Sequence, residues 1–376
     1  MYTIKWTALF IAVALCLLCP ATGAQAQNAE QHTYARLMKA GFDQIRNADY
    51  PAARDSFGQA LEYNDSSADA HLGLGLAYFH LRDDKYAERE LSKALELDPK
   101  ASTACQFLGE LYYRKDDLET ALSWWDKAVE LDPADSKLRA RVERVRREHK
   151  TEKDFNRDVT SHFLVKYEGR EKIEAGRIIL RVLEDAYGEL GRALSFYPDG
   201  EIQVILYSGK QFKEVTEAPG WSGGVYDGKI RIPIGGIEEE TPGLRKLLYH
   251  EYTHAVVRAI TPHCPTWLNE GLAQYFEGRE IDSRQREVLK RMAGAGKLPA
   301  LSNLEGSFMG LGADQAGHAY LFSLSVVRYM VDDFRMYRIK TVLEELAAGA
   351  DINKAISGGL MVTYEEFERG WRTSLE

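Results

Sequence analysis

Small and bulky apolar residues recur with a fixed period in the first part of the chain. Between Tyr34 and Asp135 the same kinds of residue return every 34 positions. The matching sets are Gly41, Gly75 and Gly109; Ala53, Ala87 and Ala121; Ala60, Ala94 and Ala128; and Phe57, Leu91 and Trp125. Small residues at such positions allow two helices to cross closely, and bulky ones fill the gap to the next unit. The pattern predicts six antiparallel helices in three stacked pairs over residues 34–133, with breaks near 65, 99 and 133.

The end of each repeat strengthens this interpretation. The segment ALELDP at 94–99 returns as AVELDP at 128–133, and the first copy has ALEYND at 60–65. A proline at this point stops the second helix of a unit. The next segment, Asp135–Lys150, is helical in pattern and heavily charged, as expected of a capping helix. An ordinary two-helix bundle is the alternative, but it does not require the same positions to coincide in three copies.

These residues and this period resemble the tetratricopeptide repeat, over three units. The resemblance implies an α-solenoid domain, with its capping helix, over residues 27–150. It also implies a concave face that binds a protein or peptide partner. From Thr151 onward the period is lost, so we expect a second domain over residues 151–376.

The second domain begins with short strands and ends with helices. HFLVKY at 162–167 and EIQVILY at 201–207 alternate as strands do, and residues 171–196 carry apolar side chains at helical spacing. GVYDGKIRIPI at 224–234 predicts a hairpin around Asp227-Gly228. Further predicted elements are a helix from Thr241-Pro242 to Ile260, a helix from about Pro265, and helices from about Asp282 to the end with a loop at 298–312. The predicted fold class is α+β, with a small mixed sheet followed by a helical half.

Residues 1–26 have the pattern of a secretory signal peptide. Lys5 precedes an apolar run from Trp6 to Leu18, and Ala24-Gln25-Ala26 forms a small-x-small cleavage site. An uncleaved membrane anchor is the alternative, but the run is shorter than the ~20 residues that a spanning helix needs. We therefore expect a periplasmic or secreted protein without stable membrane insertion.

Composition and charge add two exclusions. Hydrophobic residues make up 45% of the chain and charged residues 28%, as is ordinary for a globular protein. The net charge of −9 is spread without a basic tract, which argues against nucleic acid or an anionic membrane as partner. Cys105 and Cys264 remain after cleavage. We expect two isolated buried thiols, and a disulfide between the two domains is the alternative.

The chemistry of the second domain is concentrated in HEYTH at 250–254, inside the apolar run LRKLLYHEYTHAVVRAI. On a helix, His250 and His254 project from one face and can bind one metal ion. Glu251 is rotated by about 100° and lies beside the ion, where it can take a proton from a water and pass it to a leaving amine. Burying these polar groups is unfavourable unless a metal offsets it, although the motif can also arise by chance.

A further carboxylate follows in TWLNEGLA. Glu270 comes 16 residues after His254, and a connection through Pro262 and Pro265 lets a second helix return against the first. Glu270 can then supply a third ligand and leave the fourth position for water. Two imidazoles and a carboxylate in a tetrahedral set suit zinc, so we expect one Zn²⁺ per chain.

HEYTH followed by WLNEGLAQYFEG resembles the gluzincin metallopeptidases. The order HFLVKY, GVYDGKIRIP, HEYTH, PTWLNEGLAQY resembles the peptidase-MA-like domains that are often joined to tetratricopeptide repeats in bacterial exported proteins, over most of residues 155–375. By this resemblance His250, His254 and Glu270 are zinc ligands and Glu251 is the general base. The chain lacks the GxMEN segment with which the zinc aminopeptidases read a free amine, and its spacing from His254 to Glu270 is shorter than theirs. Both departures favour internal cleavage.

Other residues carry weaker expectations. The resemblance makes Tyr320 or His318, in GHAYLFS, a candidate to stabilise the tetrahedral intermediate, and core packing is the alternative for Tyr320. His263 is expected to face solvent and Trp267 to lie in the core. Glu277 can support a ligand, but a solvated helix face is its simpler interpretation.

Two classes of function stay open from the sequence. The favoured one is an exported zinc metallopeptidase whose repeats recruit a protein or peptide substrate. The rival is a non-catalytic repeat scaffold with a structural or inactive zinc domain. The presence of Glu251 favours the enzyme, because a structural metal site has no need of that carboxylate.

The signal-peptide hypothesis predicts a mature N-terminus near Gln27, since the small-x-small site ends at Ala26. N-terminal sequencing of the exported protein measures this directly. Recovery of intact Met1 in the membrane fraction would favour the anchor instead.

Overall fold

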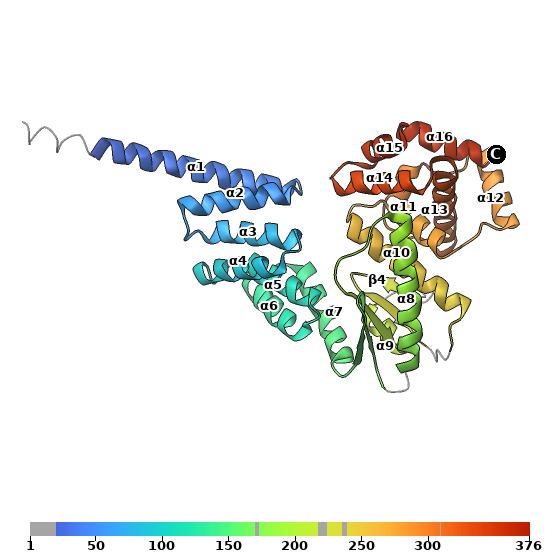
Figure 1. The fold of residues 1–376 in the computed structure, drawn as a ribbon, viewed down its shortest axis with the longest axis horizontal. Coiled ribbons are helices and arrows are strands. Elements are labelled where there is room, and N and C mark those ends of the chain that lie inside the picture. The colour runs from blue at the N-terminus through green and yellow to red at the C-terminus, as the bar shows by residue number, and fades with distance from the viewer. Residues whose placement is uncertain (1–19, 170–172, 217–223, 235–238, 309) are drawn as a thin grey trace, which may run out of the picture. The chain divides into compact units, whose positions relative to one another are not determined.

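The computed structural model describes residues 20–169, 173–216, 224–234, 239–308 and 310–376 (Figure 1). The chain divides into two compact units, Met1–His149 and Lys150–Glu376. The predicted domain boundary after residue 150 lies one residue beyond this division. Most of the predicted signal peptide, residues 1–19, lies outside the described residues, and its predicted cleavage site falls within the first helix.

The first unit consists of consecutive helices in antiparallel pairs. They are α1 (Pro20–Arg46), α2 (Tyr50–Tyr63), α3 (Ala68–His80), α4 (Asp84–Leu97), α5 (Ser102–Arg114), α6 (Leu118–Leu131) and α7 (Ser136–Glu152), whose last residues, from Lys150 on, belong to the second unit. α1 packs on α2, α3 on α4 and α5 on α6, which confirms the three predicted pairs and the breaks between them. α1 begins well before Tyr34, so it is longer than the repeat alone predicts.

The glycines of the 34-residue pattern lie where the paired helices cross. A Cβ added at Gly109 would stand 2.4 Å from the Trp125 ring, and one at Gly41 would stand 2.7 Å from the Phe57 ring. The Phe57 ring also leaves no room for a Cβ at Gly73, in the next pair. A bulky residue of one helix therefore fills space left by glycines in its own pair and in the following one.

The second helix of each pair begins at an aspartate that sequence analysis overlooked. Asp49, Asp83 and Asp117 are N-caps, and their carboxylates accept hydrogen bonds from backbone amides three residues on. Such caps satisfy amide groups that have no partner within the helix, and each contributes about 1 kcal/mol to stability. They recur at the same 34-residue period as the glycines.

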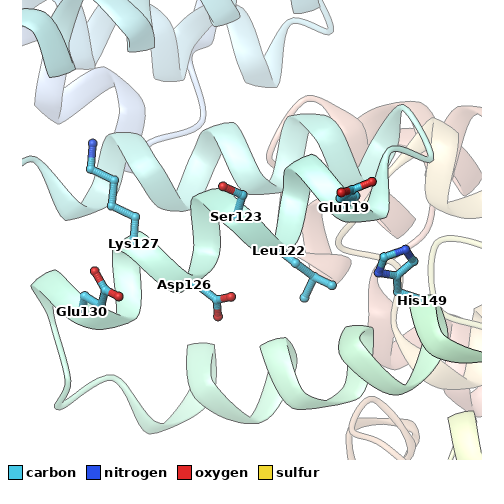
Figure 2. Close-up of a pocket in the computed structure, with 7 residues that line it drawn as sticks. All are labelled: Glu119, Leu122, Ser123, Asp126, Lys127, Glu130 and His149. Atoms are coloured by element: carbon cyan, nitrogen blue, oxygen red, sulfur yellow. The ribbon is translucent and has the colours of Figure 1, made fainter.

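A charged surface hollow of about 630 Å³ lies between α6 and α7 (Figure 2). Its lining consists of Glu119, Leu122, Ser123, Asp126, Lys127, Glu130 and His149. Asp126 already forms an ion pair with Arg146 of α7. The hollow is thus a feature of the repeat unit, and it contains none of the residues to which the sequence assigned chemistry.

The second unit begins with a five-stranded mixed sheet in the order β1-β2-β3-β5-β4. The strands are β1 (Asn156–Val159), β2 (Phe163–Tyr167), β3 (Ile202–Tyr207), β4 (Val225–Tyr226) and β5 (Ile230–Pro233). β2, β3 and β5 are parallel, and β1 and β4 are antiparallel edge strands. α8 (Ile173–Leu194) makes the crossover that two parallel strands require. The predicted hairpin is confirmed as β4 and β5.

Two elements were missed because their sequences lack a clear apolar period. β1 reads NRDV and is mostly exposed, and α9 (Gly209–Thr216) is eight residues long with two buried residues, Phe212 and Val215. Both flank the parallel strands that the sequence predicted correctly. Tertiary pairing, and not local pattern, decides their conformation.

Helices form the rest of the unit, as predicted. They are α10 (Pro242–Ile260), α11 (Thr266–Phe276), α12 (Ser283–Gly294), a short 3₁₀ helix at Leu301–Leu304, α13 (Ala313–Phe334), α14 (Met336–Ala347), α15 (Ile352–Leu360) and α16 (Tyr364–Ser374). One continuous apolar core joins α8, one face of the sheet, α10 and this helical half. The α+β fold class is confirmed.

α11 and α13 cross closely, which holds α13 against the start of the helical half. A Cβ at Gly271 of α11 would stand 2.4 Å from the carbonyl oxygen of Ser323 on α13, so only glycine allows this approach. Gln274 is buried at the same crossing, and its amide donates to the carbonyl oxygen of Tyr320 at 2.8 Å. α11 and α13 are thereby held as one block.

Two further expectations concern the thiols and the membrane. Cys105 and Cys264 are both free thiols, the first buried as expected and the second only partly buried. In the part of the chain that the structure describes, no helix is long and apolar enough to cross a membrane.

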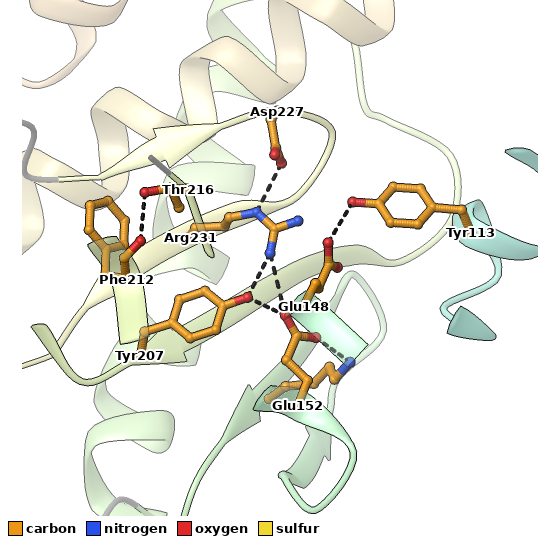
Figure 3. A network of polar contacts seen from close by, with 9 residues as sticks. Tyr113, Glu148, Glu152, Tyr207, Phe212, Thr216, Asp227 and Arg231 are labelled. Atoms are coloured by element: carbon orange, nitrogen blue, oxygen red, sulfur yellow. Dashed lines mark hydrogen bonds and ion pairs between the residues drawn. The ribbon is translucent and has the colours of Figure 1, made fainter. Parts of the chain in front are cut away.

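The second face of the sheet carries a buried ion cluster (Figure 3). Glu152, the last residue of α7, accepts from Lys166 on β2 at 2.7 Å and from Tyr207 on β3. It also pairs with Arg231 on β5 at 3.4 Å, and Arg231 reaches Asp227 at 3.1 Å. One carboxylate therefore joins three parallel strands.

Loss of that carboxylate should destabilise the second unit strongly. Glu152→Ala leaves the buried Lys166 and Arg231 without a shared counter-charge, and breaking a buried pair typically costs about 3–5 kcal/mol. Denaturant unfolding measures the change, with the exposed Glu143→Ala on the same helix as control. Equal unfolding midpoints for the two variants would contradict this account of the cluster.

Candidate metal centre

α10 and α11 bring the three predicted ligands together. His250 and His254 project from α10, which Thr241 caps and Pro242 opens, and Glu270 projects from α11. Glu270 Oε2 lies 3.7 Å from Nε2 of His250 and 3.7 Å from Nε2 of His254. Within the described ranges, these residues form the group whose ligand atoms are close enough to hold an ion, all within 4.8 Å of one another.

The donor set fits a zinc ion. Ligand bonds of about 2.0–2.1 Å in a tetrahedron place ligand atoms roughly 3.3 Å apart, close to the separations in this centre. Glu270 Oε2 is buried and has no hydrogen-bond partner. An unsatisfied buried carboxylate oxygen is costly, and a cation between it and the two imidazoles would satisfy it.

Each imidazole is oriented by a second oxygen on its other nitrogen. His250 Nδ1 lies 2.9 Å from Glu277 Oε2, and His254 Nδ1 lies 3.1 Å from Asn269 Oδ1. Nδ1 of a neutral imidazole then carries the proton and donates it, so the lone pair of Nε2 faces Glu270. Both partners come from α11 or its end.

The structure contradicts the simpler interpretation of Glu277 from the sequence, a solvated helix face. Its side chain is only 14% exposed and contacts His250, so it does not lie on a solvated helix face. It follows the last residue of α11 and thus returns toward α10. Asn269 was missed altogether, although its place directly before Glu270 in the Asn-Glu-Gly segment was an available signal.

Glu251 lies beside the centre and outside the ligand group. It is 5% exposed, and burial raises its pKa to about 7; the neighbouring His250 opposes this rise, and Glu270 and Glu277 add to it. A carboxyl group with a pKa near neutrality can both accept a proton and return it. Glu251 thus has the burial and the proton affinity of an acid–base group.

Carboxylates around the two histidines affect the pKa of each imidazole. Burial disfavours a charged imidazole at His250, but the nearby carboxylates of Glu270 and Glu277 outweigh burial and raise the pKa of His250 to about 10. Burial lowers the pKa of His254. The surrounding carboxylates therefore favour positive charge in the place that a divalent ion would occupy.

Tyr320 lies near the centre on α13. Burial raises its pKa, and the carboxylates of Glu270 and Glu251 raise it further, so its hydroxyl stays protonated. Its ring also packs edge-on against Phe308, with centroids 5.7 Å apart. Tyr320 thus packs against the core, and its hydroxyl lies within the electrostatic influence of Glu270 and Glu251.

The remaining candidates lie away from the centre. His318 is exposed and stacks on Phe322, so it is not brought to the ligands. His263 is exposed and Trp267 is fully buried in the core, as expected.

The chain matches two family models. Residues 190–376 match the Peptidase MA superfamily, and residues 39–102 and 85–136 match the tetratricopeptide repeat. This confirms the fusion that the sequence motifs indicated. A search of curated proteins found no match.

Solved structures similar to the chain include repeat proteins. The first repeat domain of Spaghetti, bound to an HSP90 peptide, is 18% identical and covers 32% of this chain and 94% of its own, with a TM-score of 0.30. The Yersinia enterocolitica type III secretion chaperone SycD, in complex with a peptide of the translocator YopD, is 22% identical. The match covers 32% of this chain and 95% of SycD, with a TM-score of 0.31. A Thermobaculum terrenum O-GlcNAc transferase is 13% identical. The match covers 60% of this chain and 44% of the transferase, with a TM-score of 0.29.

The orientation of His250 predicts how zinc binding responds to changes at Glu277. Glu277→Gln keeps an oxygen acceptor but removes the charge, and Glu277→Ala removes both. Zinc affinity should fall in that order, by about 10- to 100-fold for alanine. Competition with a chromophoric chelator measures it. Glu280→Gln, at a side chain 75% exposed, is the control and should bind zinc like the parent; parent-like affinity in both Glu277 variants would contradict the orientation.

Proposed function

We propose that this chain, in which residues 190–376 form a Peptidase MA superfamily domain behind tetratricopeptide repeats, is an exported zinc metallopeptidase of the gluzincin type. The single observation that supports it best is Glu270 Oε2, buried without a hydrogen bond and 3.7 Å from both Nε2 atoms. A set of acceptors that converge on one point calls for a cation. His250, His254 and Glu270 would hold the zinc ion, one per chain.

Glu251 performs the proton transfers in this proposal. A bound zinc ion would supply Lewis acidity toward the scissile carbonyl and the attacking water. The Glu251 carboxylate accepts the proton of the attacking water and then delivers it to the leaving amine. Its pKa of about 7 suits both steps, and its burial keeps bulk water from competing for the proton.

Tyr320 stabilises the developing oxyanion in this proposal. A phenol whose pKa is raised stays protonated and can donate a hydrogen bond to that oxygen. Gln274 supports this role, because it ties the carbonyl oxygens of both Tyr320 and Glu270 to one amide. Tyr320 and Glu270 then keep a fixed relation on two packed helices.

Substrate class and location follow from sequence features. The missing GxMEN segment supports internal cleavage over release of terminal residues. The pattern of residues 1–26 supports export to the periplasm or beyond. The repeats are proposed to recruit a protein or peptide, substrate or partner, on their concave face.

The rival proposal is a repeat scaffold with a structural or inactive metal site. Such a site needs its ligands but not Glu251. A carboxyl group buried at 5% exposure and not used as a ligand destabilises the fold, so its presence supports the enzyme.

Glu251→Gln separates the two proposals. The amide keeps size and polarity but accepts no proton, so peptide hydrolysis should fall by about 10²–10⁴-fold while zinc content and melting temperature stay near those of the parent. A peptide-library digest compares the two proteins, with the exposed Glu287→Gln as control. Equal cleavage by parent and variant removes Glu251 from the mechanism, and no cleavage by either supports the scaffold.

A further inference from the structure

The start of the β4–β5 hairpin runs against the side chain of Glu251. Gly224, directly before β4, is buried. A Cβ added there would stand 2.9 Å from Glu251 Oε1, 3.0 Å from its Cγ and 3.1 Å from its Cδ. Carbon atoms in proteins do not pack that closely, so the Glu251 carboxyl group occupies the space of a side chain at position 224.

Glu251 is held in this place by packing. Its side chain makes no hydrogen bond to any residue of the described ranges, in contrast to His250 and His254. α10 packs against both β4 and β5, which keeps the hairpin backbone next to Glu251. An acid–base group needs its oxygens free for the reaction, and support by shape leaves them free.

The two glycines of the hairpin serve different purposes. Gly228, in the turn, has a φ of 109°, a conformation that other residues adopt only under strain, and nothing lies within 4 Å of its missing side chain. At Gly224 a side chain would displace the Glu251 carboxyl group. Position 224 is thus constrained by the carboxylate opposite it.

We propose that Gly224 is a positioning residue for Glu251: its bare backbone forms the wall against which the acid–base carboxylate rests, and any side chain there turns the carboxylate away from the metal centre. The contact between Gly224 and the Glu251 carboxyl group is inferred from geometry alone. The catalytic consequence rests on the proposed function.

A double-mutant cycle in stability tests the packing part. Gly224→Ala should raise the unfolding equilibrium constant by about tenfold in the parent, because it overpacks a filled site. In a Glu251→Ala background the carboxylate is gone, the new methyl group fits, and the same substitution should change stability little. Equal destabilisation in both backgrounds would overturn the contact as the reason for glycine.

Kinetics of the zinc-loaded protein test the positioning part. Gly224→Ala should lower kcat by about 10²-fold with KM and zinc content unchanged, since a misplaced group costs rate and not binding. Gly243→Ala, on α10 itself with its nearest neighbour at 3.9 Å, should match the parent. A folded, zinc-loaded Gly224→Ala with parental kcat overturns the proposal. If the parent cleaves no peptide, the proposed function fails, and the stability cycle still decides the packing.

Discussion

Glu270 Oε2 faces the Nε2 atoms of His250 and His254 at 3.7 Å, in a buried place where it has no hydrogen bond. Two imidazole lone pairs and a carboxylate oxygen repel one another unless a cation lies among them. The carboxylates of Glu270 and Glu277 favour positive charge at this place, and they raise the pKa of His250. The arrangement of the second unit around α10 and α11 serves to keep these three atoms together.

Several contacts fix the parts of the centre against one another. Gly271 allows α11 to cross α13 closely, and Gln274 ties the two helices at Tyr320. Glu277 and Asn269 fix the two imidazole rings from behind. The hairpin completes the centre from the sheet side, since Gly224 leaves room for Glu251. The three candidate ligands, Glu251 and the residues that support them thus come from α10, α11, α13 and one hairpin.

Periodic and motif-based features were visible in the sequence. The 34-residue spacing gave three helix pairs because glycine and bulky residues must meet at each crossing. HEYTH was singled out because spacing on a helix determines which side chains share a face. Glu270 was added because Pro262 and Pro265 let a second helix return against the first.

Contacts between distant segments were not visible. A solvated helix face was the simpler interpretation of Glu277, and support of a ligand the alternative, because local pattern says nothing about the return of α11 toward α10. The ion cluster of Glu152 with Lys166 and Arg231 joins residues from one helix and two strands, and no spacing rule predicts it. Gly224 carried no signal either, because its reason lies in a side chain on another element.

The central claim is that these three residues bind one zinc ion. Anomalous diffraction from crystals of the zinc-loaded protein, recorded on both sides of the zinc absorption edge, tests it most directly. The account predicts one peak per chain, about 2.0–2.1 Å from Nε2 of His250, Nε2 of His254 and a carboxylate oxygen of Glu270. The absence of a peak among these atoms, or a peak ligated by other residues, would contradict it.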